Sequence, residues 1–148
     1  MKITVNKAEN LLVYNHGETE PWGACEGVIT DGGGEKINAI CVRTLSLIPT
    51  CRSVKISDIE EADGKRIVLK KGCGIGGAVS DCAIKARQQI VKEGVDGERK
   101  HRARLNSLCF DTESGEITDV TVLGFPMSKK KKISINKIWV KENTIYVE

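Results

Sequence analysis

The sequence has few aromatic residues and no long hydrophobic run. Phe, Trp and Tyr make up 4% of its 148 residues, so a hydrophobic core has to be built mainly from aliphatic side chains and cysteine. No stretch approaches the roughly 20 apolar residues that a membrane-spanning helix needs. Residues 1–4 alternate like a strand and do not begin the apolar core of a secretory signal. We therefore expect a cytoplasmic protein whose cysteines are reduced thiols.

The cysteines lack the C-x-x-C spacing that is typical of many zinc and redox sites. The chain has six of them: Cys25, Cys41, Cys51, Cys73, Cys82 and Cys109. When the chain is compared with itself at an offset of 80, Cys25 falls on Leu105 and Cys109 falls on Ile29, which is typical of small core residues. Buried structural thiols are the favoured interpretation, with a zinc or cluster site and a reactive thiol at Cys73 as the alternatives.

A glycine-rich segment in the middle of the chain has the spacing of a dinucleotide-binding motif. Gly72, Gly74 and Gly77 form G-x-G-x-x-G after a strand-like run, and Asp96 follows about 20 residues after the motif. Such a site needs a buried parallel strand that enters the first glycine and further strand–helix units, whereas two lysines precede this glycine and no such units follow. We interpret the segment as a linker with helical structure that ends near Gln89 and is followed by a strand.

The two halves of the chain share a pattern at an offset of about 80 residues. H-G-E at 16–18 falls on D-G-E at 96–98, and Asp31 falls on Asp111. Apolar positions agree as well: Ile37 with Ile117, Ile40 with Val120, and Val42 with Val122. Val-, Ile- and Thr-rich runs between Asp, Gly and Ser turns predict short antiparallel strands. About six such strands in each half suit a small closed barrel, which leaves no exposed sheet edge.

Each half resembles a PRC-barrel domain, the family of the cytoplasmic part of the reaction-centre H subunit and of the carboxy-terminal half of RimM. The second half carries the motifs more closely: V-D-G-E at 95–98, D-T-E-S-G-E-I at 111–117, I-S-I-N-K-I at 133–138 and T-I-Y-V at 144–147. The resemblance implies a mainly β protein with two tandem antiparallel barrels. The expected units are repeat 1 at 1–71, a glycine-rich linker with a short helix at 72–84, and repeat 2 at 85–148.

The resemblance implies a binding or adaptor module for protein–protein interaction or complex assembly, and not an enzyme. Neither His16 nor His101 has a Ser, Cys or carboxylate at a catalytic spacing, so no catalytic, cofactor or metal residue is predicted. The expected partner is another protein, and a homo-oligomer is left open. Trp22 and Trp139 either pack at the barrel ends or anchor a partner.

The net charge is +3, and the surplus lies in residues 72–148, which hold 13 Lys and Arg against 10 Asp and Glu. It is concentrated in two clusters: Arg99, Lys100, Arg102 and Arg104, and Lys129, Lys130, Lys131 and Lys132. They form either solvated loops or a patch for phosphates or an acidic partner. The alternative function is therefore RimM-like binding of RNA or the ribosome through basic loops of repeat 2.

Overall fold

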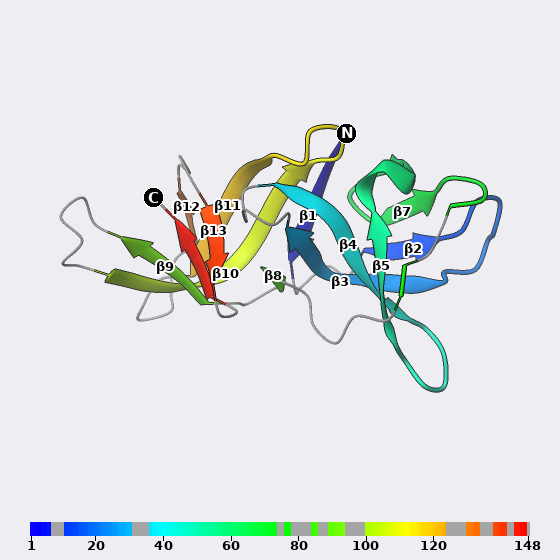
Figure 1. The fold of residues 1–148 in the computed structure, drawn as a ribbon, viewed down its shortest axis with the longest axis horizontal. Helices are drawn as coiled ribbons and strands as arrows, with labels where there is room; N and C mark the ends of the chain where they lie inside the picture. The colour runs from blue at the N-terminus through cyan, green and yellow to red at the C-terminus, as the bar shows by residue number, and fades with distance from the viewer. Residues whose placement is uncertain are drawn as a thin grey trace.

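The computed structural model is built almost entirely of β-strands (Figure 1). It describes residues 1–6, 11–30, 36–73, 76–77, 84–85, 89–93, 100–123, 130–133, 138–141 and 144–147. Within these ranges the one helical element is the 3-10 turn η1 (Ile56–Asp58), between β5 and β6. The predicted mainly β fold class is confirmed.

Most strands of the first half form one seven-stranded sheet. Their spatial order is β5 (Cys51–Lys55), β4 (Ile37–Thr44), β3 (Gly23–Thr30), β2 (Leu12–Tyr14), β7 (Arg66–Leu69) and β6 (Ile59–Ala62), with β8 (Ile84–Lys85) also paired to β3. Neighbouring strands are antiparallel, except that β2 and β7 run parallel.

Most strands of the second half form another seven-stranded sheet. Their order is β12 (Lys130–Ile133), β11 (Ile117–Leu123), β10 (Lys100–Asp111), β9 (Gln89–Glu93), β14 (Thr144–Val147) and β13 (Ile138–Lys141), with β1 (Lys2–Asn6) also paired to β10. Here β9 and β14 are the parallel pair. The two sheets therefore have the same strand order, with the parallel pair at the same place in each.

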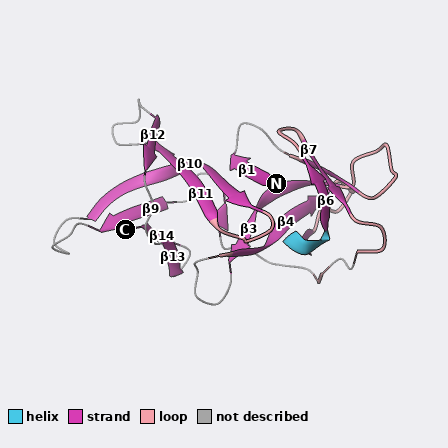
Figure 2. Cartoon of the chain, turned by 90° about the horizontal axis from the view of Figure 1, so that it is seen from above, coloured by secondary structure: helices cyan, strands magenta, loops and turns pink. Residues whose placement is uncertain are grey.

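Each sheet also takes in a strand from the other part of the chain. β1, at the amino terminus, pairs with β10 of the second sheet, where Ile3 lies opposite Phe110. β8, which precedes the second-half strands in sequence, pairs with β3 of the first sheet, where Ile84 lies opposite Val28. In Figure 2 the second-half strands lie on the left and the first-half strands on the right, with β1 between them. The two exchanged strands join the halves through backbone hydrogen bonds.

The expected closed barrels and the expected linker helix are not found in the described residues. Each sheet is an open path that ends in two edge strands, β5 and β6 in one and β12 and β13 in the other. The long strand β10 uses one edge for two partners, β9 at one end and the exchanged β1 at the other. This arrangement extends the sheet along the strand direction and does not close it.

The helix prediction is wrong at Ile84–Lys85, which is strand β8. The strand predicted to follow Gln89 is found as β9 (Gln89–Glu93). The helical spacing of apolar residues in this segment included Ile90, and β-branched residues such as isoleucine favour strands. Pairing with β3 and β10 satisfies the backbone polar groups that an isolated short helix would have had to satisfy alone.

The core is mainly aliphatic, as the scarcity of aromatic residues predicted. It forms one cluster that contains residues of both sheets. Its largest fully buried side chains are Phe110, Ile3, Ile37, Ile40, Ile67, Leu69, Leu105, Leu108 and Val13. Because Ile3 belongs to the exchanged strand β1, the exchange is held by side-chain packing as well as by hydrogen bonds.

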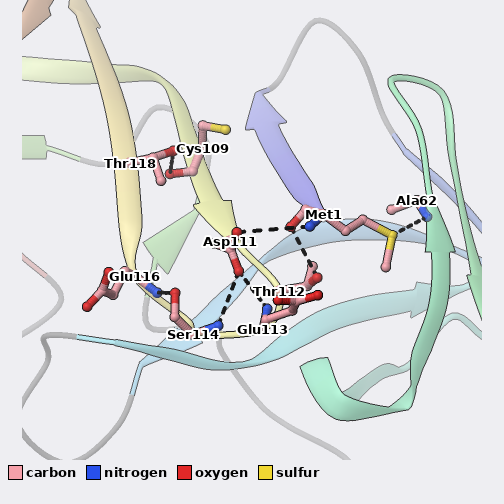
Figure 3. A network of polar contacts seen from close by, with 9 residues as sticks. All are labelled: Met1, Ala62, Cys109, Asp111, Thr112, Glu113, Ser114, Glu116 and Thr118. Carbon is pink, nitrogen blue, oxygen red and sulfur yellow. Dashed lines mark hydrogen bonds and ion pairs between the residues drawn. The ribbon is translucent and has the colours of Figure 1, made fainter.

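The turn between β10 and β11 is built around Asp111 (Figure 3). The Asp111 Oδ1 atom accepts hydrogen bonds from the backbone N–H groups of Glu113, at 2.8 Å, and Ser114, at 3.2 Å. These two bonds hold the pKa of the Asp111 carboxyl below its ordinary value. Gly115 follows with φ of 75°, a left-handed conformation that favours glycine. The predicted D-T-E-S-G-E hairpin turn is confirmed.

The same turn holds the start of the exchanged strand β1. Asp111 Oδ2 lies 3.9 Å from the amino-terminal nitrogen of Met1. The Met1 carbonyl oxygen accepts a hydrogen bond from the backbone N–H of Thr112 at 2.8 Å and another from its hydroxyl at 3.1 Å (Figure 3). On its other side, the Met1 sulfur accepts a hydrogen bond from the backbone N–H of Ala62. Met1 therefore contacts both halves of the chain.

Candidate functional site

Exposed hydrophobic side chains gather at the tip of the β4–β5 hairpin. The connecting loop, residues 45–50, has the sequence L-S-L-I-P-T, and we call it the docking loop. Leu47 is 104% exposed, Ile48 81% and Leu45 56%, and these are three of the four exposed large hydrophobic residues in the described ranges. Single exposed apolar residues are ordinary, whereas neighbouring ones form an exposed apolar patch.

Hydrogen bonds give the docking loop a defined conformation. At its base the Thr44 N–H donates to the Thr50 carbonyl oxygen at 2.9 Å, and the Thr50 N–H donates to the Thr44 hydroxyl at 2.9 Å. At its tip the Ser46 hydroxyl donates to the Ile48 carbonyl oxygen at 2.8 Å. The loop therefore presents its hydrophobic side chains from a braced backbone.

An open hollow of about 430 Å³ lies beside the docking loop. It is lined by Trp22, Thr44, Leu45, Ser46, Thr50 and Arg52. The Trp22 carbonyl oxygen accepts a hydrogen bond from the Leu45 N–H at 3.1 Å, which fastens the loop to the hollow. Trp22 is partly buried and packs against the core, so the packing alternative considered from the sequence is found for this residue. The side chain of Trp139, on β13, lies outside the described residues.

At the base of the hairpin, strands β3, β4 and β5 bring together Glu26, Cys41 and Cys51. One oxygen of Glu26 and the two sulfur atoms all lie within 4.8 Å of one another. The Cys51 thiol donates a hydrogen bond to Glu26 Oε2 at 3.0 Å, and Arg43 Nη1 donates to Glu26 Oε1 at 3.2 Å. The register of β3 against β4 shifts between Cys25 and Gly27, and such a bulge re-aims the side chain between them, here that of Glu26.

The expectation of reduced thiols is wrong for Cys41, which is disulfide-bonded. Cys82 lies outside the described residues. The C-x-x-C rule could not detect the cluster, because Cys41 and Cys51 are adjacent through the pairing of β4 with β5 and not through sequence spacing. The alternation of side chains between the two faces of the hairpin is the sequence signal that could have predicted this cluster.

The remaining described cysteines carry thiols. Cys25 is buried, as predicted, and burial raises its pKa to about 12. Burial also raises the pKa of the Cys73 thiol, and Asp58 adds to the effect. A raised pKa lowers the thiolate fraction at neutral pH and disfavours the reactive-thiol alternative for Cys73. Cys109 is a thiol with an intermediate burial.

The glycine-rich segment has a packing role at one described position. The Gly76 N–H donates to the Ser53 carbonyl oxygen on β5 at 2.9 Å, and a Cβ atom at Gly76 would overlap the Ser53 hydroxyl. Gly72 has φ of 70° in a turn that follows β7. Of the apparent nucleotide motif, Gly74 and Asp96 lie outside the described residues.

The two predicted basic clusters lie largely in strands, and not in the loops in which we expected them. Lys100, Arg102 and Arg104 are on β10, and Lys130, Lys131 and Lys132 are on β12. β11 separates these strands, and its Leu123 is the register partner of both Arg104 and Lys130. The structure thus brings the clusters into one sheet. Arg99 and Lys129 lie outside the described residues.

The two histidines lie on different sheets. His16 Nδ1 lies 3.0 Å from Glu60 Oε2 at an exposed position that follows β2. His101 is on β10, opposite Lys92 of β9.

No helix in the described ranges is long and apolar enough to cross a membrane.

Comparison with known proteins adds no relative: no family model matches the chain, and no curated protein matches it.

Proposed function

We propose that this chain is a non-enzymatic binding module that docks on another protein through residues 45–50. The observation that carries this proposal is the exposure of Leu45, Leu47 and Ile48 on one hydrogen-bonded loop. Burying a Leu or Ile side chain releases about 1.5–3 kcal/mol. Two such residues at the centre of an interface therefore suffice to act as its principal contacts.

The shape and order of the loop support a protein partner. The projecting hydrophobic side chains lie next to a hollow lined in part by Trp22 and Arg52. A partner surface with an apolar depression and one projecting side chain of its own would be complementary to this arrangement. Trp and Arg are the residue types enriched at energetically dominant interface positions. Because the loop is already braced, binding does not have to order its backbone, a cost that otherwise weakens association.

We also propose that the two halves are tandem copies of a PRC-barrel-like unit. The common strand order and the matching parallel pairs, β2–β7 and β9–β14, support it. In this interpretation β1 and β8 are equivalent strands exchanged between the copies. Adaptor roles in larger assemblies are what the resemblance implies.

A second function, RimM-like binding of RNA or the ribosome, is favoured by the shared sheet of β10 and β12. The register partners Arg104, Leu123 and Lys130 lie on one row across three strands. Each phosphate contact makes binding more sensitive to salt. The logarithm of the binding constant falls against the logarithm of the salt concentration with a slope of roughly 0.9 per contact for duplex DNA, and less for single strands. Retention on heparin that falls steeply with salt and weakens in Arg102→Ala/Arg104→Ala would support this function. Retention independent of both would contradict it.

The test of the docking proposal compares Leu47→Ser/Ile48→Ser with the wild-type chain in affinity enrichment from the cells that make the protein. We expect the variant to retain at least about 10-fold less of a specific protein, since loss of two buried side chains exceeds the 1.4 kcal/mol of a tenfold change. Glu113→Ser changes an exposed residue of a different hairpin and is the matched control. Thermal melting should be unchanged in both variants.

Two outcomes would contradict a protein partner. In one, the variant and the wild-type chain enrich the same proteins equally. In the other, the wild-type chain sediments with lipid vesicles and Leu47→Ser/Ile48→Ser does not, which would assign the loop to a membrane surface. Light scattering of both proteins shows whether a second copy of the chain is the partner.

A further inference from the structure

Three side chains with metal-binding atoms meet at the base of the docking loop. Glu26 comes from β3, Cys41 from β4 and Cys51 from β5, and their ligand atoms lie within 4.8 Å of one another. Zinc binds sulfur at about 2.3 Å and carboxylate oxygen at about 2.0–2.2 Å, so tetrahedral ligands are separated by about 3.5–4 Å. Small side-chain rotations would bring the three atoms to that separation.

The disulfide of Cys41 makes this ligand depend on reduction. A sulfur atom held in a disulfide is not a thiolate, and the thiolate is the form of cysteine that binds a metal ion. A dithiol reductant gives two electrons and two protons to the bond, becomes a disulfide itself, and leaves two thiols where the bond was. With Cys51 and Glu26, the reduced Cys41 gives two sulfur atoms and one oxygen, and a water molecule can serve as the fourth ligand.

Arg43 provides the outer contact that such a site needs. Its guanidinium holds Glu26 Oε1 at 3.2 Å, while Glu26 Oε2 faces the Cys51 sulfur at 3.0 Å. Arg43 is also the register partner of Cys51 on the neighbouring strand. A carboxylate that binds a metal is typically hydrogen-bonded in turn. The positive guanidinium would also offset the negative charge of thiolates and a carboxylate around one divalent ion.

We propose that Glu26, Cys41 and Cys51 form a redox-gated zinc site. In the disulfide form Cys41 cannot act as a thiolate ligand, and the site does not hold zinc. In the reduced form the Cys41 and Cys51 thiols lose their protons to solvent as zinc binds, which yields a tetrahedral site of two thiolates, one carboxylate and a water molecule. The soft sulfur donors select zinc over magnesium or calcium, which prefer oxygen ligands. The bound ion would join β3, β4 and β5 directly below the docking loop.

The test uses the full chain, reduced with dithiothreitol and then freed of it under anaerobic conditions, and the same chain left oxidised. Zinc is titrated against a chromophoric chelator, and bound zinc is counted by elemental analysis. We expect one zinc per reduced chain and less than about one-tenth of that per oxidised chain. Cobalt in place of zinc should give a thiolate-to-metal charge-transfer band in the reduced chain alone.

Substitutions assign the ligands. Cys51→Ser and Glu26→Gln should each weaken zinc binding at least about 10-fold, the lower limit seen for loss of even an outer contact. Cys109→Ser removes a thiol on β10 and is the matched control, with wild-type affinity expected. Three results would overturn the proposal: no zinc on the reduced and folded chain, equal zinc on the oxidised chain, or wild-type affinity in Cys51→Ser. Circular dichroism confirms that each variant is folded.

Discussion

Lys36 and Glu116 form an antiparallel β-bridge, and they lie 80 positions apart in the sequence. Beside them, the Ile37 N–H donates to the Gly115 carbonyl oxygen at 2.7 Å. Where two equivalent units meet across a two-fold axis, a residue on the axis contacts its own equivalent. The bridge joins positions that are equivalent at the 80-residue offset, as the tandem-copy proposal expects for residues on such an axis.

Substitution of Gly115 tests this contact. Gly115→Ala places a side chain at φ of 75° and drives its Cβ into the carbonyl oxygen of Ile37. The left-handed conformation costs about 1–2 kcal/mol, and the overlap adds about 1–3 kcal/mol. Gly17→Ala is the matched control, because Gly17 has the same φ of 75° and no atom within 4 Å. Urea unfolding should show the larger loss for Gly115→Ala, and equal losses would mean that the contact with Ile37 is unimportant.

The strand exchange predicts that a change near the amino terminus acts on the second half. Ile3 on β1 is 1% exposed and lies opposite Phe110 on β10. Ile3→Ala should destabilise the protein by about 2–5 kcal/mol. Hydrogen exchange should become faster in β10, far away in sequence. Faster hydrogen exchange confined to strands β2–β7 would contradict the pairing of β1 with β10.

Two adjacent glycines test whether the glycine-rich segment needs glycine for close packing or only for a flexible backbone. Gly76→Ala should destabilise the chain by about 1–3 kcal/mol, because its Cβ would meet the Ser53 hydroxyl and lie 2.9 Å from the Ser53 carbonyl oxygen. A Cβ atom at Gly77 would have no neighbour within 4 Å, so Gly77→Ala should be tolerated. Thermal melting checks both variants.

The linker interpretation also predicts that calorimetry detects no binding of NAD or ATP.

The pH dependence of stability should include a term from Asp111. Hydrogen bonds from the Glu113 and Ser114 N–H groups lower its folded pKa below the ordinary 3.8. The stabilisation is therefore fully present above the unfolded pKa, and it is lost as the pH falls through the lower folded pKa. Asp111→Asn should melt at a lower temperature than wild type at pH 7, and the difference should shrink in strong acid. Glu113→Gln is the control, and a difference that persists unchanged at low pH would contradict this role.

Alternation and turn chemistry predicted much of the fold. The strand pattern of "GEITDVTVLGF" and the Asp111 turn are local features, and both are found in the structure. The exchange of β1 and β8 was not predictable in this way, because a strand's own residues do not specify which of two similar edges it joins. The same limitation led to the expectation of closed barrels. The helical structure expected to end near Gln89 is absent at Ile84–Lys85, where pairing with β3 overrode a helical spacing of apolar residues. The strand expected after Gln89 is present as β9.

The candidate site was predicted only in part. Trp22 was considered either as a packing residue or as a partner anchor. The sequence did not show that Leu45, Leu47 and Ile48 are exposed, since exposure depends on where the hairpin turns. Glu26 and Cys51 are 25 residues apart, and only the pairing of three strands makes them neighbours. The basic clusters were found from composition, which is independent of whether they lie in loops or strands.

The most direct test of docking through residues 45–50 is a photo-crosslink from position 47. A benzophenone amino acid replaces Leu47 in one chain and Glu113 in a control chain, and both are expressed in the cells that make the protein. Docking through the loop predicts one dominant crosslinked protein from position 47 and none of it from position 113. The same set of weak products from both positions would contradict the proposal.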